Sequence, residues 1–211
     1  MNTGLSRRKL VLLALVTEGV LTILALFWVW VMDLDLMLHW SMPAVIWGLG
    51  AVIPLLVFNF GIFASLARHQ ERFKRYREFL HGVVCPLCTE ANVWVALVVS
   101  ACAGIGEELF FRVALQGQLT ELVGLPFAML LTNVAFAAVH FGPALRRYWR
   151  IALVYTFVGI NLSALLIQTG SVLAPALTHA VYNFVAIVYI RYFYLPSFSE
   201  SELLQHAKNS P

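Results

Sequence analysis

The sequence predicts an all-α, polytopic membrane protein with about six transmembrane helices in one bundle. Two observations carry this prediction. The 211 residues are 61% hydrophobic and 12% charged, whereas soluble globular chains are about 25% charged. A transmembrane helix needs roughly 20 apolar residues, and six such segments can be read directly: 10–31, 43–66, 93–115, 125–141, 151–168 and 172–190. This composition excludes a water-soluble fold, a disordered chain and a nucleic-acid-binding protein.

The chain is expected to form one membrane domain, 1–211, because its length leaves no room for a soluble domain. The first apolar segment is too long for a signal peptide and no A-x-A-like cleavage site follows it. We therefore interpret it as a retained helix. The basic stretch 69–80 carries Phe73, Tyr76 and Leu80 at helical spacing, which predicts a helix lying on the inner leaflet of the bilayer. Residues 195–211 are expected to form a polar tail.

The basic residues predict the orientation. Thirteen of the fourteen Lys and Arg residues lie in regions that alternating spans place on one side of the membrane: 7–9, 68–77, 146–150 and 191–208. The other connections, 32–42, 116–124 and 169–171, contain none. The positive-inside rule makes the basic side cytoplasmic, so both ends of the chain should be inside. We expect a multi-pass protein of the plasma (inner) membrane, and the net charge of +3 needs no acidic partner to explain it.

The fourteenth basic residue, Arg112, lies inside the third predicted span together with Glu107 and Glu108. Ionisable residues within a span are costly, which makes them candidates for a functional site. Glu108 and Arg112 are four residues apart, share a helix face and can pair. Glu107 lies about 100° around the helix, so it is free to face another helix and is a candidate general base. A structural Glu–Arg pair is the competing interpretation.

Two further predicted spans carry polar groups. His140 ends the fourth span, with Phe136 one turn before it on the same face, and His179 and Asn183 share a face of the sixth. Each histidine alone could simply make a hydrogen bond between helices. Three separate helices with such groups are harder to explain structurally.

Three residues keep no assigned role. Glu18 in the first span can pair with a polar group of the bundle or line an access path. Cys85 and Cys88 have the spacing of a zinc or redox pair, but no complete ligand set accompanies them. We interpret them as structural or incidental thiols.

Three motifs together resemble a known family. The segment Glu107-Glu108-x3-Arg112 is similar to an EExxxR motif, Phe136-x3-His140 to FxxxH, and His179-x3-Asn183 to HxxxN. In this order and on separate membrane helices, they resemble the CPBP family of intramembrane proteases, which includes CAAX prenyl proteases and the bacteriocin-processing Abi proteins. The resemblance covers about 91–185.

The resemblance implies peptide-bond hydrolysis within the membrane. By position, Glu107 would activate water with His140 beside it, and His179 and Asn183 would polarise the carbonyl and stabilise the oxyanion. Glu108 and Arg112 would form a supporting pair. Cofactors stay open, because Glu107, His140 and His179 can together hold Zn²⁺ and a glutamate–histidine pair can also activate water unaided.

The resemblance also implies the partners: the lipid bilayer, and a membrane-associated protein or peptide as substrate, for example a prenylated C-terminus or a bacteriocin-like peptide.

Two other classes of function compete with the protease interpretation. A small proton or cation transporter would use Glu107, His140 and His179 as an ion path, although no internal repeat supports transport. A non-catalytic immunity or scaffold protein would retain the residues without the activity. On the predicted boundaries, moreover, Glu107 and His179 lie in the outer half of the bilayer and His140 in the inner half.

Overall fold

The computed structural model describes residues 7–68, 73–89 and 91–197, and every regular element in these ranges is helical. The longer elements are α1 (Arg7–Val31), α2 (Met42–Arg68), α5 (Val93–Glu108), α6 (Gln116–Val123), α7 (Leu125–Phe141), α8 (Leu145–Thr169) and α9 (Leu173–Tyr189). Short elements are α3 (Lys74–Phe79), η1 (Leu80–Val84), α4 (Cys85–Cys88), η2 (Leu109–Leu115), η3 (Gly142–Ala144), η4 (Ile190–Tyr194) and η5 (Leu195–Ser197). The all-helical prediction is thus confirmed for the described residues.

Five helical stretches of the described chain are long and apolar enough to cross a membrane. Four of these stretches correspond to the predicted first, second, third and sixth spans. The remaining stretch, Leu125–Thr169, contains both the predicted fourth span and the predicted fifth span. Gly142 interrupts this stretch with a φ of 46°, a backbone conformation that favours glycine. Beyond it, α8 folds back and packs against α7. The protein therefore contains several membrane-length helices, while the count of six crossings and their orientation stay predictions.

Some predicted boundaries differ from the structure. The third span, predicted to end at residue 115, continues without a break to Val123, because the π-helical segment η2 joins α5 to α6. The expected interfacial helix is described only from Lys74 onward, as α3 followed by η1, and residues 69–72 lie outside the described residues. Of the expected polar tail, only Leu195–Ser197 is described, as a 3-10 turn.

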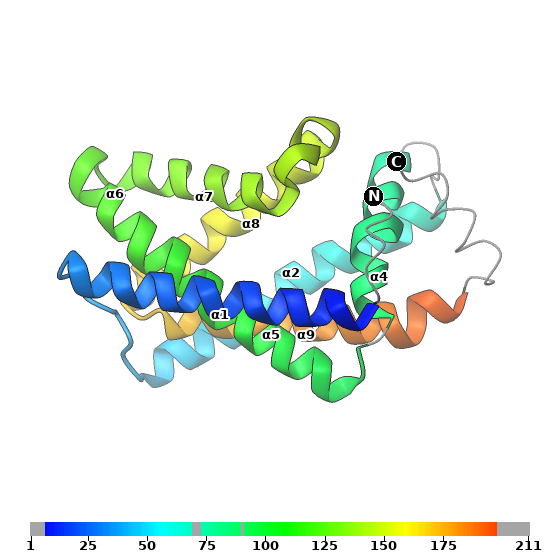
Figure 1. Ribbon diagram of the computed structural model, residues 1–211, viewed down its shortest axis with the longest axis horizontal. Coiled ribbons are helices and arrows are strands. Elements are labelled where there is room, and N and C mark those ends of the chain that lie inside the picture. Colours follow the sequence, from blue (N-terminus) through cyan, green and yellow to red (C-terminus); the bar gives the residue numbers. More distant parts are fainter. Residues whose placement is uncertain (1–6, 69–72, 90, 198–211) are drawn as a thin grey trace.

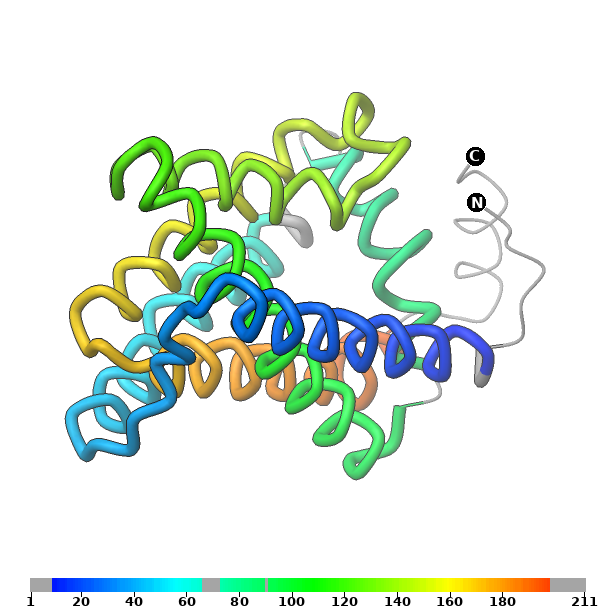
Figure 2. The backbone as a smooth tube through the Cα atoms, turned by 60° about the vertical axis from the view of Figure 1, so that its left-hand side comes forward, coloured from blue at the N-terminus to red at the C-terminus, as the bar shows by residue number. Residues whose placement is uncertain are grey.

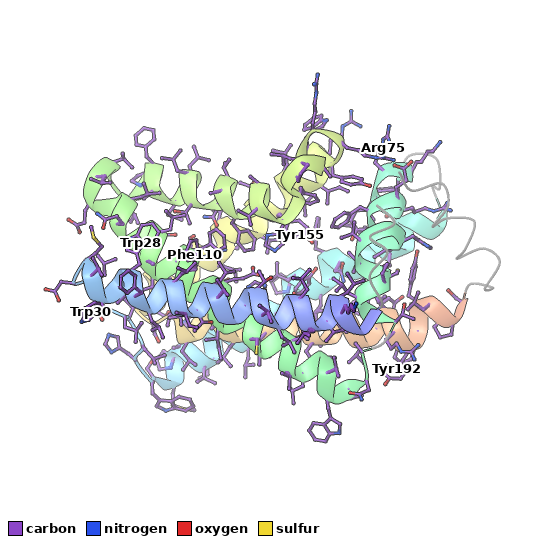
Figure 3. All side chains as sticks on the ribbon, viewed as in Figure 1. Trp28, Trp30, Arg75, Phe110, Tyr155 and Tyr192 are labelled. Carbon is purple, nitrogen blue, oxygen red and sulfur yellow. The ribbon has the colours of Figure 1, made fainter. Side chains whose placement is uncertain are left out.

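The helices are arranged around α5. It packs against α1 on one side and α9 on the other, and α9 also packs against α2 and α8. Figure 1 shows α5 crossing α1 and α9 obliquely, with α6 and α7 above them. Figure 2 shows α2 beside α9, with which it packs. Beyond α5, α1 continues along η2, where the rings of Trp28 and Phe110 lie 6.0 Å apart (Figure 3).

The predicted basic regions gather toward one end of the molecule. The start of α1, the segment α3–α4 and the end of α9 lie at the right in Figure 1, and the turn between α7 and α8 points the same way. Arg75, labelled in Figure 3, marks this end. There, Glu78 of α3 forms ion pairs with Arg75 at 2.9 Å and with Arg147 of α8 at 3.0 Å. Two regions expected on the same side of the membrane are therefore in direct contact.

Two glycines allow α5 to approach its neighbours closely. A Cβ atom at Gly104 would lie 2.7 Å from the carbonyl oxygen of Ala176 and 2.8 Å from the Cβ of Ala180, both in α9. A Cβ atom at Gly106 would lie 2.8 Å from the carbonyl oxygen of Glu18 in α1. Small residues permit such close packing between membrane helices. These glycines therefore set how near α1 and α9 come to the end of α5, where the two motif glutamates follow.

Candidate active site

The candidate site forms where α5, η2, α7 and α9 meet. Glu107 and Glu108 are the last residues of α5, and Arg112 follows in η2. His140 is in the last turn of α7, and His179 lies in α9, one turn before Asn183. A π-helical segment in a long helix frequently marks a functional site, and here it begins directly after the glutamate pair. The structure thus brings together the three helices that carry the motifs.

Glu108 is held from two sides. Its Oε2 atom forms an ion pair with Arg112 Nε at 3.0 Å, and its Oε1 atom accepts a hydrogen bond from His179 Nδ1 at 2.7 Å. The side chains of Glu108 and Arg112 are both 0% exposed. A buried charge requires such compensation, because its desolvation costs several kcal/mol. With both oxygens engaged, Glu108 serves as an anchor for Arg112 and His179.

Arg112 has further partners on the far side from Glu108. Its Nη2 atom donates a hydrogen bond to the carbonyl oxygen of Gly159 in α8 at 3.3 Å, and its guanidinium lies 4.5 Å from the centroid of the Phe136 ring. A Cβ atom at Gly159 would lie 3.2 Å from Arg112 Nη2 and would clash with the amide of Asn133. The glycine in α8 therefore makes room for a buried arginine.

Glu107 faces both histidines. Its Oε2 atom lies 3.5 Å from His140 Nε2 and 3.9 Å from His179 Nε2. His140 Nδ1 bonds to the carbonyl oxygen of Phe136 at 2.8 Å. That acceptor requires a proton on Nδ1, so Nε2 of neutral His140 carries a lone pair directed at the Glu107 side. His179 is oriented in the same way, by its Nδ1 bond to Glu108.

Aromatic rings fix the two imidazoles. The Phe136 ring lies 4.5 Å from the His140 ring and 6.2 Å from the His179 ring, measured between centroids. The predicted contact between Phe136 and His140 is therefore present. Tyr155 of α8, in the interior of the bundle in Figure 3, packs against His140 with its centroid 5.0 Å away. Rings around both histidines restrict their rotation and reduce the access of bulk water.

A cavity of about 410 Å³ opens beside this cluster. Most of its wall is apolar and comes from α2, α3–α4, α8 and α9. His140, His179 and Asn183 line it, and so does Glu18 of α1. Sequence reasoning left Glu18 without a role, although an ionisable residue inside an apolar span was the signal for it. The structure places Glu18 in the candidate site.

The expected difference in depth between Glu107 and His140 does not keep them apart. Because η2 extends the third span to Val123, Glu107 lies near the middle of a 31-residue helix. The last turn of α7, which holds His140, meets the long helix at this level. His140 and Glu107 are therefore 3.5 Å apart although they stand at different distances from the ends of their helices.

The zinc ligands expected from the sequence are Glu107, His140 and His179. Two imidazole nitrogens and a carboxylate oxygen form a donor set that suits Zn²⁺. Within the part of the chain that the structure describes, however, no group of three or more His, Cys, Asp or Glu side chains is placed to hold a metal ion. The zinc ligand set therefore stays a prediction, and we derive no step through a metal.

Cys85 and Cys88 are not among the residues that line the cavity. Both thiols are buried in an apolar cluster with Phe63 and Ile190, and burial raises the pKa of each thiol to about 12. They are therefore protonated at neutral pH, and thiols are poor nucleophiles and poor metal ligands in that form. His81 Nε2 makes a hydrogen bond with the hydroxyl of Tyr194 at 2.9 Å.

The fold and the site define a class of protein: a helical membrane protein with a buried glutamate–histidine cluster. Residues 89–185 match the family model described as type II CAAX prenyl endopeptidase Rce1-like. This segment contains all three motifs and coincides with the range 91–185 of the predicted resemblance. Over this segment, which is less than half of the chain, the protein is similar to the CPBP/CAAX protease family. No curated protein and no solved structure matches the chain.

Proposed function

We propose that the protein is an intramembrane endopeptidase that hydrolyses peptide bonds of membrane-associated proteins or peptides. The observation that supports this proposal is the position of the Glu107 carboxylate, whose Oε2 atom faces the Nε2 atoms of both histidines at 3.5 and 3.9 Å. Glu107 Oε2 has no hydrogen-bond partner among the described residues, so this oxygen is available to accept a hydrogen bond from a water molecule. The match of residues 89–185 to a family model of CAAX-type proteases supports the same activity.

In the proposed mechanism, Glu107 acts as the general base. Its carboxylate removes a proton from a water molecule held beside His140, and the water oxygen attacks the carbonyl carbon of the scissile peptide bond. The proton then passes from Glu107 to the amide nitrogen, the carbon–nitrogen bond breaks, and the amine leaves. The second proton of the water is lost from the new carboxyl group, so that the protons balance.

The negative charge that develops on the carbonyl oxygen requires hydrogen-bond donors. Asn183 lines the cavity one turn after His179, and its amide NH₂ can donate to this oxygen. His179 in its protonated form donates from Nε2, while Glu108 holds its Nδ1 atom at 2.7 Å. Donors fixed before the reaction stabilise the oxyanion without reorganisation. Glu108, Arg112 and Phe136 support this geometry, since all three contact a histidine of the site or its anchor.

The cavity also supports a lipid-embedded substrate. Its mostly apolar wall, with polar side chains at the glutamate–histidine cluster, suits a hydrophobic ligand with one polar bond to be presented. A prenylated C-terminus and a bacteriocin-like peptide are both candidates within this class. We place the protein in the plasma (inner) membrane with both ends inside, on the strength of the basic regions.

The test uses the purified protein in proteoliposomes with farnesylated and unprenylated model peptides. Glu107→Gln preserves the size of the side chain and removes the base, and we expect it to lower the cleavage rate about 10²- to 10⁴-fold. Glu121→Gln is the matched control, because Glu121 is an exposed carboxylate of α6 outside the proposed machinery. This control should cleave like the wild type.

Proton and cation flux across the same proteoliposomes is measured in parallel. Flux that is lost in Glu107→Gln, without any cleaved product from the wild type, would support a transporter. If membranes from cells with the wild type and with Glu107→Gln yield the same set of peptides, and the purified proteins neither cleave nor conduct, the scaffold interpretation is supported. Cleavage that survives Glu107→Gln contradicts the proposed role of this residue.

A further inference from the structure

Glu18 lies outside the segment that matches the family, yet its carboxyl group is part of the candidate site. It belongs to α1, it is 9% exposed, and it lines the same cavity as His140 and His179. Its buried Oε2 atom has no hydrogen-bond partner among the described residues and lies against Gly106, the residue before Glu107. A third glutamate thus joins the glutamate pair of α5 from a neighbouring helix.

The packing of α1 on α5 brings this contact about. A Cβ atom at Gly106 would lie 2.8 Å from the Glu18 carbonyl oxygen, 2.9 Å from Thr22 Oγ1 and 3.2 Å from Glu18 Oε2. Only a glycine leaves room for such an approach. The Thr22 hydroxyl in turn donates a hydrogen bond to the Glu18 carbonyl oxygen at 2.8 Å. The backbone and the carboxyl group of Glu18 are therefore both pressed against the residue that precedes Glu107.

The contact is costly for a structural role alone. A carboxylate in the middle of a membrane helix costs about 3 kcal/mol on insertion scales. The buried cation of the site, Arg112, is paired with Glu108 at 3.0 Å. Two carboxyl groups this close together in a dry site cannot both be ionised cheaply, so one of them can donate a hydrogen bond to the other. A neutral residue would pack α1 on α5 without this cost.

We propose that Glu18 is a positioning residue for Glu107. Its carboxyl group holds the Glu107 carboxylate by a hydrogen bond across the α1–α5 contact, so that Glu107 Oε2 stays directed at the two histidines. This inference rests on the proposed peptidase function. It assigns to α1, which carries no motif, a part in the orientation of the catalytic base.

The experiment compares two substitutions at Glu18 in the proteoliposome assay. Glu18→Ala removes the hydrogen bond, and we expect kcat to fall about 10- to 100-fold, because misplacement of a catalytic group by about 1 Å has effects of this order. KM should stay within about twofold, since the apolar wall of the cavity, where the substrate is expected to bind, is unchanged. Glu18→Gln keeps an N–H donor for the Glu107 carboxylate, and its kcat should return to within about threefold of the wild type.

The matched control is Thr17→Ala, at the neighbouring position of α1, where the threonine hydroxyl bonds only to the carbonyl oxygen of Leu13 on an exposed face. If Glu18→Ala does not fold, Glu18→Met fills the same space without the hydrogen bond and should show the same loss of kcat. A kcat that is unchanged in these variants, or a Glu18→Gln variant as slow as Glu18→Ala, overturns the proposal. Absence of cleavage by the wild type instead contradicts the peptidase function, and the positioning role falls with it.

Discussion

Two clusters in this protein join a carboxylate to arginine, and they differ in their access to water. In the middle of the bundle, Glu108 pairs with Arg112, and both side chains are 0% exposed. At the basic end of the molecule, Glu78 pairs with Arg147 and Arg75, whose side chains are 28% and 64% exposed. The distances are nearly equal, at 3.0 Å for Arg112 and 3.0 and 2.9 Å for the other two.

Similar geometry therefore has different consequences at the two places. At the end of the molecule, either partner can be solvated by water if the other is lost, so the pair contributes little. In the bundle, loss of one partner leaves a charge without compensation. The interior cluster is thus an arrangement in which every member depends on the others, and it is the one that holds His179 in place. The outer cluster only ties α3 to α8.

The largest expected effect comes from Arg112→Leu. It leaves Glu108 buried without its cation, and we expect the free energy of unfolding to fall by about 3–5 kcal/mol. The same substitution in the outer cluster, Arg147→Leu, should cost about 1 kcal/mol or less. Unfolding in mixed detergent micelles, followed by circular dichroism, measures both. Equal losses in the two variants would contradict the distinction between the clusters.

An intermediate effect is expected from Gly104→Ala. This change moves α9, and His179 with it, away from α5 without removing any charge of the interior cluster. The new Cβ atom would lie 2.7 Å from the Ala176 carbonyl oxygen and 2.8 Å from the Ala180 Cβ, so α9 must shift. Overpacking of this kind typically costs about 1–3 kcal/mol. Because His179 moves with α9, peptide cleavage should decrease as well.

The control for this variant is Gly19→Ala in α1, where a Cβ atom would meet nothing within 4 Å. This change should leave cleavage unaffected and stability equal or slightly higher, since alanine is the better helix former. The same unfolding and cleavage assays apply to both. Full activity of Gly104→Ala would show that the position of α9 is not critical for the site.

The smallest effect is the pH dependence of the outer cluster. Burial raises the pKa of Glu78, but hydrogen bonds from Arg147 and Arg75 and the charges of these residues outweigh it, so this pKa lies below its ordinary value of 4.5. A lowered pKa in the folded state stabilises the protein above the ordinary value, and this contribution is lost as the pH falls through the lowered pKa. Glu78→Gln should therefore cost less than about 1 kcal/mol at pH 7. The difference should vanish in acid, as unfolding midpoints measured from pH 7 down to about pH 3 will show.

Sequence analysis predicted those parts of the site that depend on one helix or on the motifs. The Glu108–Arg112 pair follows from the spacing of four residues, because such residues share a helix face. The contact between Phe136 and His140 follows in the same way. The approach of Glu107 to His140 joins two helices, and only the resemblance of the motifs indicated it.

Glu18 could not be placed from the sequence, because its partner depends on the register between α1 and α5. That register is set by packing at Gly106, and hydropathy does not encode it. The predicted third span ended too early because hydropathy also does not show whether a polar side chain finds a partner inside the protein. Gln116 and Thr120 lower the hydropathy of the segment, but they are accommodated inside the protein: Gln116 accepts a hydrogen bond from Ser163, and the Thr120 hydroxyl donates to the carbonyl oxygen of Gln116.

The π-helical segment η2 has a consequence for insertions and deletions. It divides Val93–Val123 into two α-helical parts whose faces are rotated relative to each other. The first part, α5, carries the two glutamates, and the second, α6, carries Gln116. Deletion of one residue within Leu109–Leu115 would turn the second part by about 100° relative to the first and shift it by about 1.5 Å. Gln116 would then leave Ser163, its partner at 2.6 Å, while the packing of α5 against α1 would persist. The length of this segment is therefore as much a part of the site as its residues are.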